Sequence, residues 1–144
     1  MQKVKEIREI FDSFPPGLMR LEYLIDLGRK SQKEFPKELR VQQHFIHGCT
    51  SNAWILILGS DPIKINTVSD SLIISGILYL LEMVFNGESK SSIDSYDAQA
   101  LLQDLGLSGN IEATSDGDEL LLQTTLGILR QALPEAYQIE QDGS

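Results

Sequence analysis

The sequence predicts an α+β fold in which helices pack against a small antiparallel sheet. Two features carry this prediction: a pair of short strand-like segments at 53–58 and 63–68, and a long apolar helical segment at 71–85. Further helical segments stand before and after the strand pair, so helices and strands are segregated along the chain. Segregated elements are typical of α+β folds, whereas regular alternation of strands and helices indicates a parallel sheet.

The N-terminal part is predicted to form two helices. Apolar residues recur at helical spacing between Ile7 and Phe14, which predicts a helix over residues 3–13. Pro15 and Pro16 end this helix and open a second one, because proline is tolerated at the first helical position but not in a helix interior.

The strand pair is predicted to form a hairpin. Residues 53–58 are a short apolar run, and residues 59–62 (Gly-Ser-Asp-Pro) have the composition of a turn. Ile63 and Ile65 then alternate with polar residues, which is the pattern of a returning strand with one buried face.

The segment at 71–85 is apolar nearly all round, so we expect it to be the central core helix. Serines and an aspartate at 69–71 are candidates for its N-cap, and Asn86-Gly87 supplies a stop signal. A further helix is expected to end at Gly106, and the last one to run from about Ser115 to Leu133. A length of 144 residues fits one domain, residues 1–144, with a core over about 7–133 and a frayed tail at 140–144.

Charge and hydropathy exclude several classes of protein. Twelve basic and 21 acidic side chains give a net charge of −9, which does not suit a phosphate backbone, so no nucleic-acid partner is expected. The most apolar segment, 71–85, is shorter than the roughly 20 residues that span a bilayer and contains Glu82. The N-terminus lacks the continuous apolar run of a signal peptide, so we expect a cytoplasmic protein with no membrane association.

Basic side chains are concentrated in one stretch of this acidic chain. Two glutamates interrupt the stretch, which reads as a solvated face, although a basic face on an acidic protein can also help to select a protein partner. The basic residues of the stretch are Arg29, Lys30, Lys33, Lys37 and Arg40.

Cys49 is the candidate functional residue, and it is the single cysteine of the chain. One cysteine excludes an internal disulfide and a multi-cysteine metal site. The residues alone leave three interpretations open. The thiol is a buried small hydrophobe, as free cysteines most often are, or a reactive group on a loop that Gly48 helps to turn, or a metal ligand with His44 and His47. The spacing H-x-x-H-G-C matches no compact zinc motif, so no metal site is expected.

A family resemblance favours the reactive thiol. The stretch GCTSNAW at 48–54 resembles the G-C-x-S-x-x-W segment of the SufE family, the sulfur acceptors of iron–sulfur cluster assembly. YLIDLG at 23–28 resembles the second helix of that family, and Ser69-Asp70 followed by Gly76 resembles the start of its core helix. The resemblance covers residues 7–133 and implies the compact α+β fold of the SufE family.

The resemblance also implies a function. A SufS-type cysteine desulfurase, which carries the pyridoxal phosphate, would hold sulfur as a persulfide, and the Cys49 thiolate would attack its outer sulfur. Cys49 would then pass the sulfur to a SufBCD-type scaffold or, as in the related CsdE branch, to another recipient. The protein itself would be a carrier and an activator of the desulfurase rather than an enzyme, and it would need no cofactor.

The chain departs from the family pattern in places. Asp116 and Glu119 stand where the family has arginine and glycine at the start of the last helix, so a docking role of that arginine does not transfer. The group that activates Cys49 and the oligomeric state stay open, with His47 a candidate activator. Two other functions also stay open: a cysteine-nucleophile hydrolase with His44 or His47 as base, and a non-catalytic interaction module whose cysteine belongs to the core.

Overall fold

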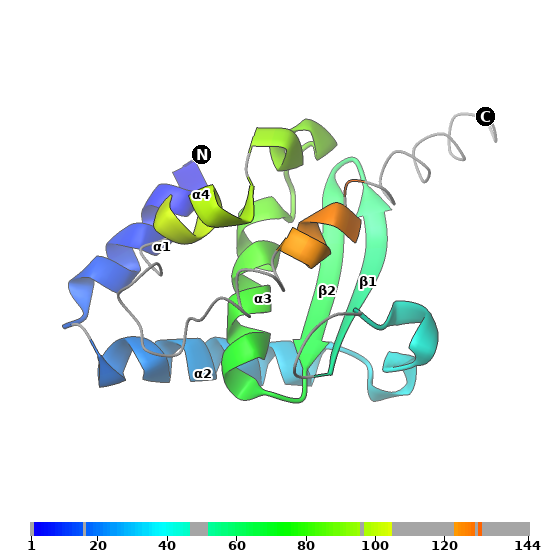
Figure 1. Ribbon diagram of the computed structural model, residues 1–144, viewed down its shortest axis with the longest axis horizontal. Coiled ribbons are helices and arrows are strands. Elements are labelled where there is room, and N and C mark those ends of the chain that lie inside the picture. The colour runs from blue at the N-terminus through cyan, green and yellow to red at the C-terminus, as the bar shows by residue number, and fades with distance from the viewer. Residues whose placement is uncertain are drawn as a thin grey trace.

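The structure is a computed structural model that describes residues 2–15, 17–46, 52–95, 97–104, 123–128 and 130. Helices pack against a two-stranded antiparallel sheet, so the predicted α+β class is confirmed (Figure 1). The last described segment, 123–128, is helical, whereas the predicted ends of this helix at Ser115 and Leu133 lie outside the described residues. In chain order the elements are α1 (Gln2–Ser13), α2 (Leu18–Glu34), the 3₁₀ turns η1 (Lys37–Leu39) and η2 (Gln42–His44), β1 (Ala53–Ser60), β2 (Ile63–Ser69), α3 (Leu72–Phe85), the 3₁₀ segment η3 (Lys90–Ser95) and α4 (Ala98–Asp104).

The strands β1 and β2 pair from Ala53–Ser69 to Ser60–Ile63. The predicted turn at 59–62 is too long, because Gly59 and Ser60 belong to β1. A register shift between Ile57 and Gly59 leaves Leu58 out of the ladder and 54% exposed. This bulge absorbs one residue, so the two strands continue pairing until only Asp61 and Pro62 remain to connect them.

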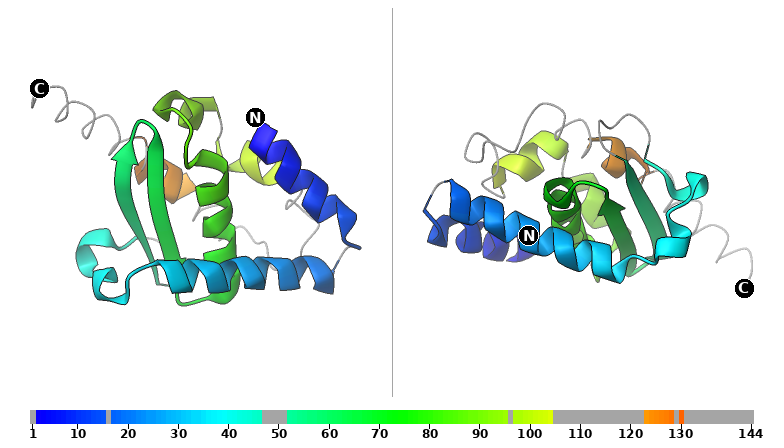
Figure 2. Two further views of the ribbon diagram at one scale, coloured as in Figure 1. Left: turned by 180° about the vertical axis from the view of Figure 1, so that it is seen from behind. Right: turned by 90° about the horizontal axis from the view of Figure 1, so that it is seen from below.

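Helix α3 is the centre of the molecule, as the apolar segment predicts. Figures 1 and 2 show it between α1 on one side and the hairpin on the other, with α2 crossing its N-terminal half. Its buried apolar side chains join those of α1, α2 and the α3-facing side of the hairpin in one main core. A smaller cluster of Phe35, Leu56 and Val68, with Trp54 packed against it, covers part of the other face of the hairpin. Among the described residues no helix is long and apolar enough to cross a membrane.

Two glycines set the distance between α2 and α3. A Cβ at Gly28 would overlap the backbone carbonyl of Leu72, and a Cβ at Gly76 would overlap the backbone carbonyl of Leu24. Each glycine therefore lies against the main chain of the other helix, where no side chain can move aside. The absence of both Cβ atoms lets the two backbones approach more closely than ordinary helix packing allows.

Replacement of Gly28 by alanine is expected to destabilise the protein by about 3 kcal/mol or more, because the added methyl group forces α2 and α3 apart. Gly127→Ala is the matched control, since nothing lies within 4 Å of a Cβ at this helical position. The control should gain up to about 1 kcal/mol from the higher helix propensity of alanine. Urea unfolding of the two variants measures both effects, and equal stability of Gly28→Ala and wild type would contradict the close crossing.

Glu82 on α3 is a buried carboxyl group that ties the helix to β2. Its side chain accepts hydrogen bonds from the Thr67 amide (3.0 Å), the Thr67 hydroxyl (2.6 Å) and the Asn66 side-chain amide (3.3 Å). The pKa of Glu82 is raised to about 7, chiefly by burial and also by the charge of Glu34, while the hydrogen bonds from Thr67 and Asn66 oppose the shift. The folded protein therefore retains the Glu82 proton to a higher pH than the unfolded chain does.

This shift makes stability depend on pH in a defined direction. The contribution of Glu82 to the free energy of unfolding is fully present below the ordinary pKa of 4.5 and is lost as pH rises through about 7. Glu82→Gln keeps the shape of the side chain but cannot ionise. Between pH 5 and pH 8, wild type should lose about 2–3 kcal/mol relative to Glu82→Gln in urea unfolding. A stability difference between the two proteins that does not change with pH would show that Glu82 keeps its ordinary pKa.

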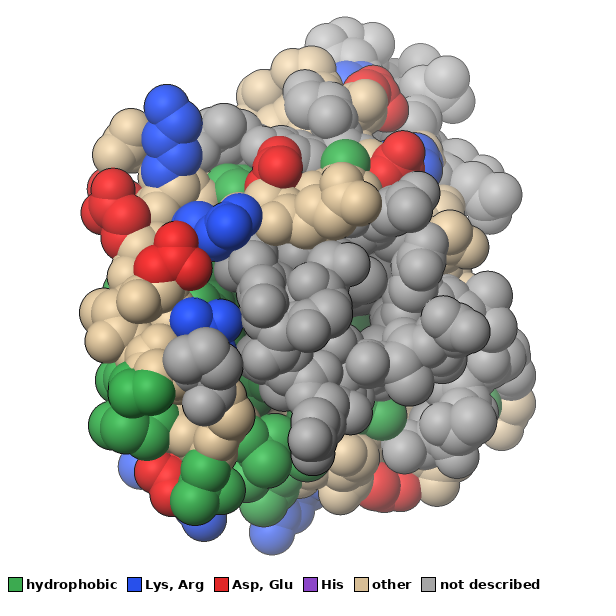
Figure 3. Space-filling view, turned by 60° about the vertical axis from the view of Figure 1, so that its left-hand side comes forward, with side chains coloured by type: hydrophobic (Ala, Val, Ile, Leu, Met, Phe, Trp, Pro, Cys, Tyr) green, Lys and Arg blue, Asp and Glu red, His purple; other side chains and the backbone are tan. Residues whose placement is uncertain are grey.

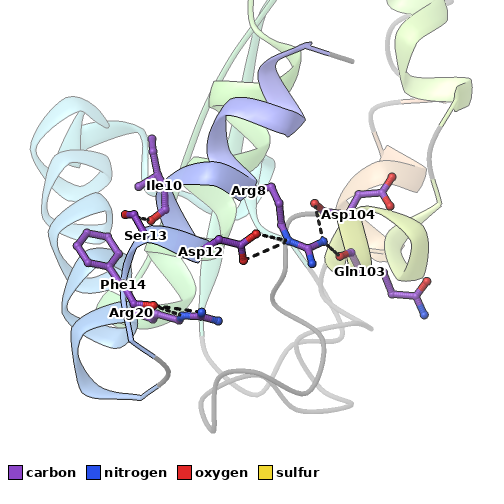
Figure 4. Close-up of polar contacts among 8 residues, drawn as sticks. All are labelled: Arg8, Ile10, Asp12, Ser13, Phe14, Arg20, Gln103 and Asp104. Carbon is purple, nitrogen blue, oxygen red and sulfur yellow. Dashed lines mark hydrogen bonds and ion pairs between the residues drawn. The ribbon is translucent and has the colours of Figure 1, made fainter.

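Polar contacts to main-chain carbonyls fasten α1 to its neighbours (Figure 4). Arg8 pairs with Asp12 and donates to the carbonyl oxygens of Gln103 (3.0 Å) and Asp104 (3.4 Å) at the end of α4. The guanidinium of Arg20 on α2 donates twice to the Phe14 carbonyl at 3.2 Å. Apolar side chains gather on the surface at the corner between α1 and α2, seen at the lower left of Figure 3. They include Ile10, Leu18 and Met19.

Candidate functional site

The candidate site is the segment between η2 and β1 that carries Cys49. Residues 47–51, which include His47, Gly48 and Cys49, lie outside the described residues. The residues on either side of this segment, Ile46 and Asn52, are described, and their contacts define how the segment is attached to the fold.

The N-terminal end of the segment is fixed to the start of β1. The Ile46 amide donates to the Ala53 carbonyl at 2.8 Å, and the Ile46 side chain is fully buried. Phe45 forms an isolated antiparallel bridge with Trp54, and their rings meet edge to face with centroids 5.8 Å apart. The aperiodic sequence before Cys49 therefore ends in a short strand-like contact with β1.

The C-terminal end of the segment is fixed to the end of β2. The Asn52 carbonyl accepts hydrogen bonds from the Asp70 amide (3.1 Å) and the Ser69 hydroxyl (2.7 Å). The Asn52 side-chain amide donates in turn to the Asp70 carboxylate at 2.8 Å. Asn52 is therefore held through both its backbone and its side chain.

Helix α3 holds the end of β2 to which Asn52 is attached. The Ser75 hydroxyl accepts from the Ser69 amide (2.7 Å) and donates to the Ser69 carbonyl (2.8 Å), and both serines are fully buried. The N-cap of α3 is Ser71, whose hydroxyl accepts from the Ile74 amide at 3.3 Å. Of the three N-cap candidates at 69–71, one caps the helix and the other two, Ser69 and Asp70, hold Asn52.

A pocket of about 520 Å³ lies beside the N-terminal end of the segment. Apolar side chains from β1 and from the helical segment 123–128 form one part of its wall, and polar side chains of η2 form another. The lining residues are Gln42, Gln43, His44, Phe45, Ile55, Ile57 and Ile128.

His44 is the one residue of the proposed His–Cys cluster that the structure describes. It ends η2 and lines the pocket. Within the described part of the chain, no group of three histidine, cysteine, aspartate or glutamate side chains is placed to hold a metal ion. His47 and Cys49 lie outside that part. The metal-ligand interpretation, which needs both, and the hydrolase interpretation, which needs Cys49, therefore stay untested.

Sequence reasoning missed the supporting residues of the site. Asn52 stands in the cysteine stretch and Ser75 in the predicted core helix, but neither was predicted to support the segment. Their role comes from contacts between β1, β2 and α3 that are distant in sequence. The signal was the run of short polar side chains at 69–71, which is longer than one helix cap requires.

Fold and site together define an α+β protein whose one cysteine lies in a short segment hydrogen-bonded at both ends to a hairpin. The family model "SufE: Fe-S metabolism associated domain" matches residues 5–117. The chain therefore belongs to the SufE family, as the cysteine stretch and its flanking motifs predicted.

Curated relatives agree with this assignment at low identity. An uncharacterised SufE-like protein of Rhizobium meliloti (strain 1021) is 29% identical over 93 residues, covering 61% of this chain and 66% of that protein. The cysteine desulfuration protein SufE of Wigglesworthia glossinidia brevipalpis is 29% identical over 87 residues, covering 59% of this chain and 60% of that protein. The chain thus spans somewhat less than two thirds of the length of these relatives.

Loss of the Ser69 hydroxyl is expected to loosen the C-terminal attachment of the segment. Ser69→Ala removes the hydrogen bond to Asn52 from a fully buried site, so it should cost about 1–3 kcal/mol of stability. The Asp70 amide, which donates to the same carbonyl, should exchange its hydrogen faster.

The control for this variant is Ser13→Ala, because the Ser13 hydroxyl is exposed and bonds only within its own helix end. It should change stability by less than about 0.5 kcal/mol. Hydrogen exchange and urea unfolding measure both variants. Unchanged exchange of the Asp70 amide in Ser69→Ala would show that Ser69 does not hold Asn52.

Proposed function

We propose that this protein is a sulfur carrier that takes persulfide sulfur from a cysteine desulfurase onto Cys49 and delivers it to an iron–sulfur cluster scaffold. The observation that carries the proposal is the GCTSNAW stretch at 48–54, which lies inside the part of the chain that matches the SufE family. In this proposal the protein also stimulates the desulfurase and works in the cytoplasm, with a SufS-type donor and a SufBCD-type recipient.

The transfer is a thiol–persulfide exchange. The Cys49 thiolate attacks the outer sulfur of the donor persulfide, a new S–S bond forms on Cys49, and the S–S bond of the donor breaks. The donor cysteine leaves as a thiolate and Cys49 becomes a persulfide, so one sulfur atom moves and no external oxidant or reductant is needed. The same exchange with a recipient thiol then moves the outer sulfur from Cys49 to the recipient.

The attachments of the segment support this role. A carrier has to offer one side chain to two partners in turn while the rest of the molecule stays folded. Cys49 is three residues from Ile46 and three from Asn52, and three residues of extended chain reach at most about 11 Å. Ile46 and Asn52 are both hydrogen-bonded at the open end of the hairpin, so the fold holds the chain on either side of the proposed carrier thiol.

A sulfur carrier needs fewer functional groups than a hydrolase does. Hydrolysis requires a nucleophile, a base and a group that orients the base, all converging on a substrate pocket. Within the described residues, His44 forms no ion pair with a carboxylate that would orient it as a base. A carrier can take its activating groups from its partner, so it needs only a thiol that the partner can reach.

Incubation with a cysteine desulfurase and free cysteine is expected to add the mass of one sulfur atom to the wild-type protein. The added sulfur should disappear on reduction, because a persulfide is a reducible S–S bond. Intact-protein mass spectrometry measures the gain, and Cys49→Ser should show none.

Two other results would reject the carrier. Wild type that gains no sulfur from a desulfurase of the same organism cannot be its acceptor. An equal gain in Cys49→Ser would place the sulfur on another group of the protein.

A further inference from the structure

The charge of this protein is distributed unevenly. Residues 29–40 contain five of the 12 basic side chains and two of the 21 acidic ones, a formal charge of +3. The remaining residues therefore have a formal charge of −12, which together with the +3 gives the net charge of −9. A short positive region within a strongly negative chain is a local feature that a partner can recognise at close range.

Four of these five basic side chains are exposed, on α2 or in η1. Arg29, Lys30 and Lys33 are exposed on α2, on the side away from the buried residues that pack against α3 and β2. Lys37 is exposed in η1, directly after the helix. We call these four residues the basic strip. In the view from below in Figure 2, α2 lies in front and no other described element covers its outer face.

The strip has little internal neutralisation. Arg29 pairs with Asp26 at 3.0 Å, and both side chains are about two-thirds exposed, so this pair is weak. Among the described residues, no carboxylate lies within ion-pair distance of Lys30, Lys33 or Lys37. Glu34, the acidic residue of α2 next to Lys33, accepts a hydrogen bond from the Tyr79 hydroxyl of α3 at 3.3 Å.

The strip is connected to the attachment of the Cys49 segment. Gln32, between the strip residues in sequence, donates to the Ser69 carbonyl at 3.0 Å, and Ser69 in turn holds Asn52. Arg40 donates to the Gln32 carbonyl at 3.2 Å, which fastens the chain after η1 to α2. Val41, which is 40% exposed, adds apolar surface on the route from η1 to the Cys49 segment.

We propose that the basic strip is the surface on which an acidic patch of the sulfur-donating protein docks. The proposal rests on the proposed function, because it assumes that a protein must approach Cys49 to deliver sulfur. A protein with a local acidic patch fits better than a nucleic acid or an anionic membrane. An extended polyanion would also lie against the rest of the chain, whose formal charge of −12 repels it. An acidic patch of the same size as the strip contacts only the strip.

Charge reversal at Lys30 and Lys33 tests the proposal. The double variant Lys30→Glu/Lys33→Glu should raise the KM for the desulfurase persulfide as sulfur donor about tenfold and leave kcat unchanged, since it alters docking and not the thiol. Added salt should weaken transfer to wild type more than transfer to this variant.

The matched control is Lys5→Glu/Lys64→Glu, which changes the net charge by the same amount at two exposed lysines on α1 and at the far end of the hairpin. Its KM should stay within about twofold of that of wild type. Equal KM values for the strip variant and wild type, or an equal rise in the control, would overturn the proposal.

A binding measurement separates this proposal from the proposed function. In the Cys49→Ser background, titration calorimetry with the desulfurase reports docking without sulfur transfer. Weaker binding of the strip variant supports the strip as the docking surface, even if wild type gains no sulfur. A lack of sulfur gain would reject only the carrier function. Binding that the strip substitutions leave intact overturns the strip alone. Loss of affinity only for duplex DNA or anionic lipid vesicles, tested in parallel, also overturns it.

Discussion

The close crossing of α2 and α3 is the constraint on which the rest of the structure depends. Gly28 and Gly76 each lie against the backbone of the opposite helix, so the separation of the helices is set by main chain rather than by side-chain packing. Backbone contacts of this kind cannot be relieved by a change of rotamer. The position of every element that packs on either helix depends on this crossing, including the position of β2, which contacts both helices.

The hairpin is held on this pair of helices by polar as well as apolar contacts. Ser31 of α2 donates to the Thr67 carbonyl at 2.6 Å, and Glu82 of α3 accepts from the amide and hydroxyl of the same residue. Asn86, just after α3, accepts from the Ile65 amide and donates to the Ile65 carbonyl. Polar groups thus fix β2 at several points along its length, which leaves its register little freedom and places Ser69 next to Asn52.

The sequence was sufficient for features that depend on local sequence patterns. The first helix and the second strand were predicted from the spacing of their apolar residues, the second helix from its prolines, and the first strand and α3 from continuous apolar runs. The cysteine stretch at 48–54 pointed to the SufE family, and the family match over residues 5–117 confirmed it.

Features that depend on contacts between distant residues were not predicted. The bulge at Leu58 extended β1 into the expected turn, and the bridge between Phe45 and Trp54 arose in a segment without any period. Glu82 appeared in the sequence only as a charge within an apolar helix. Its burial follows from the central position of α3, and its partners on β2 became visible only when the two elements were placed together.

The hydrogen bond between Ile46 and Ala53 also closes the chain between these two residues into a ring. The entropy of closing a flexible loop grows slowly with its length, by about 0.6 kcal/mol for each doubling, so a change in the length of such a ring costs little stability by itself. In such an arrangement the distance that the segment can reach and the stability of the fold are separate properties. In the carrier that we propose, a longer or shorter segment would present the thiol to a donor persulfide at a different depth, while the same hairpin and helices anchor it.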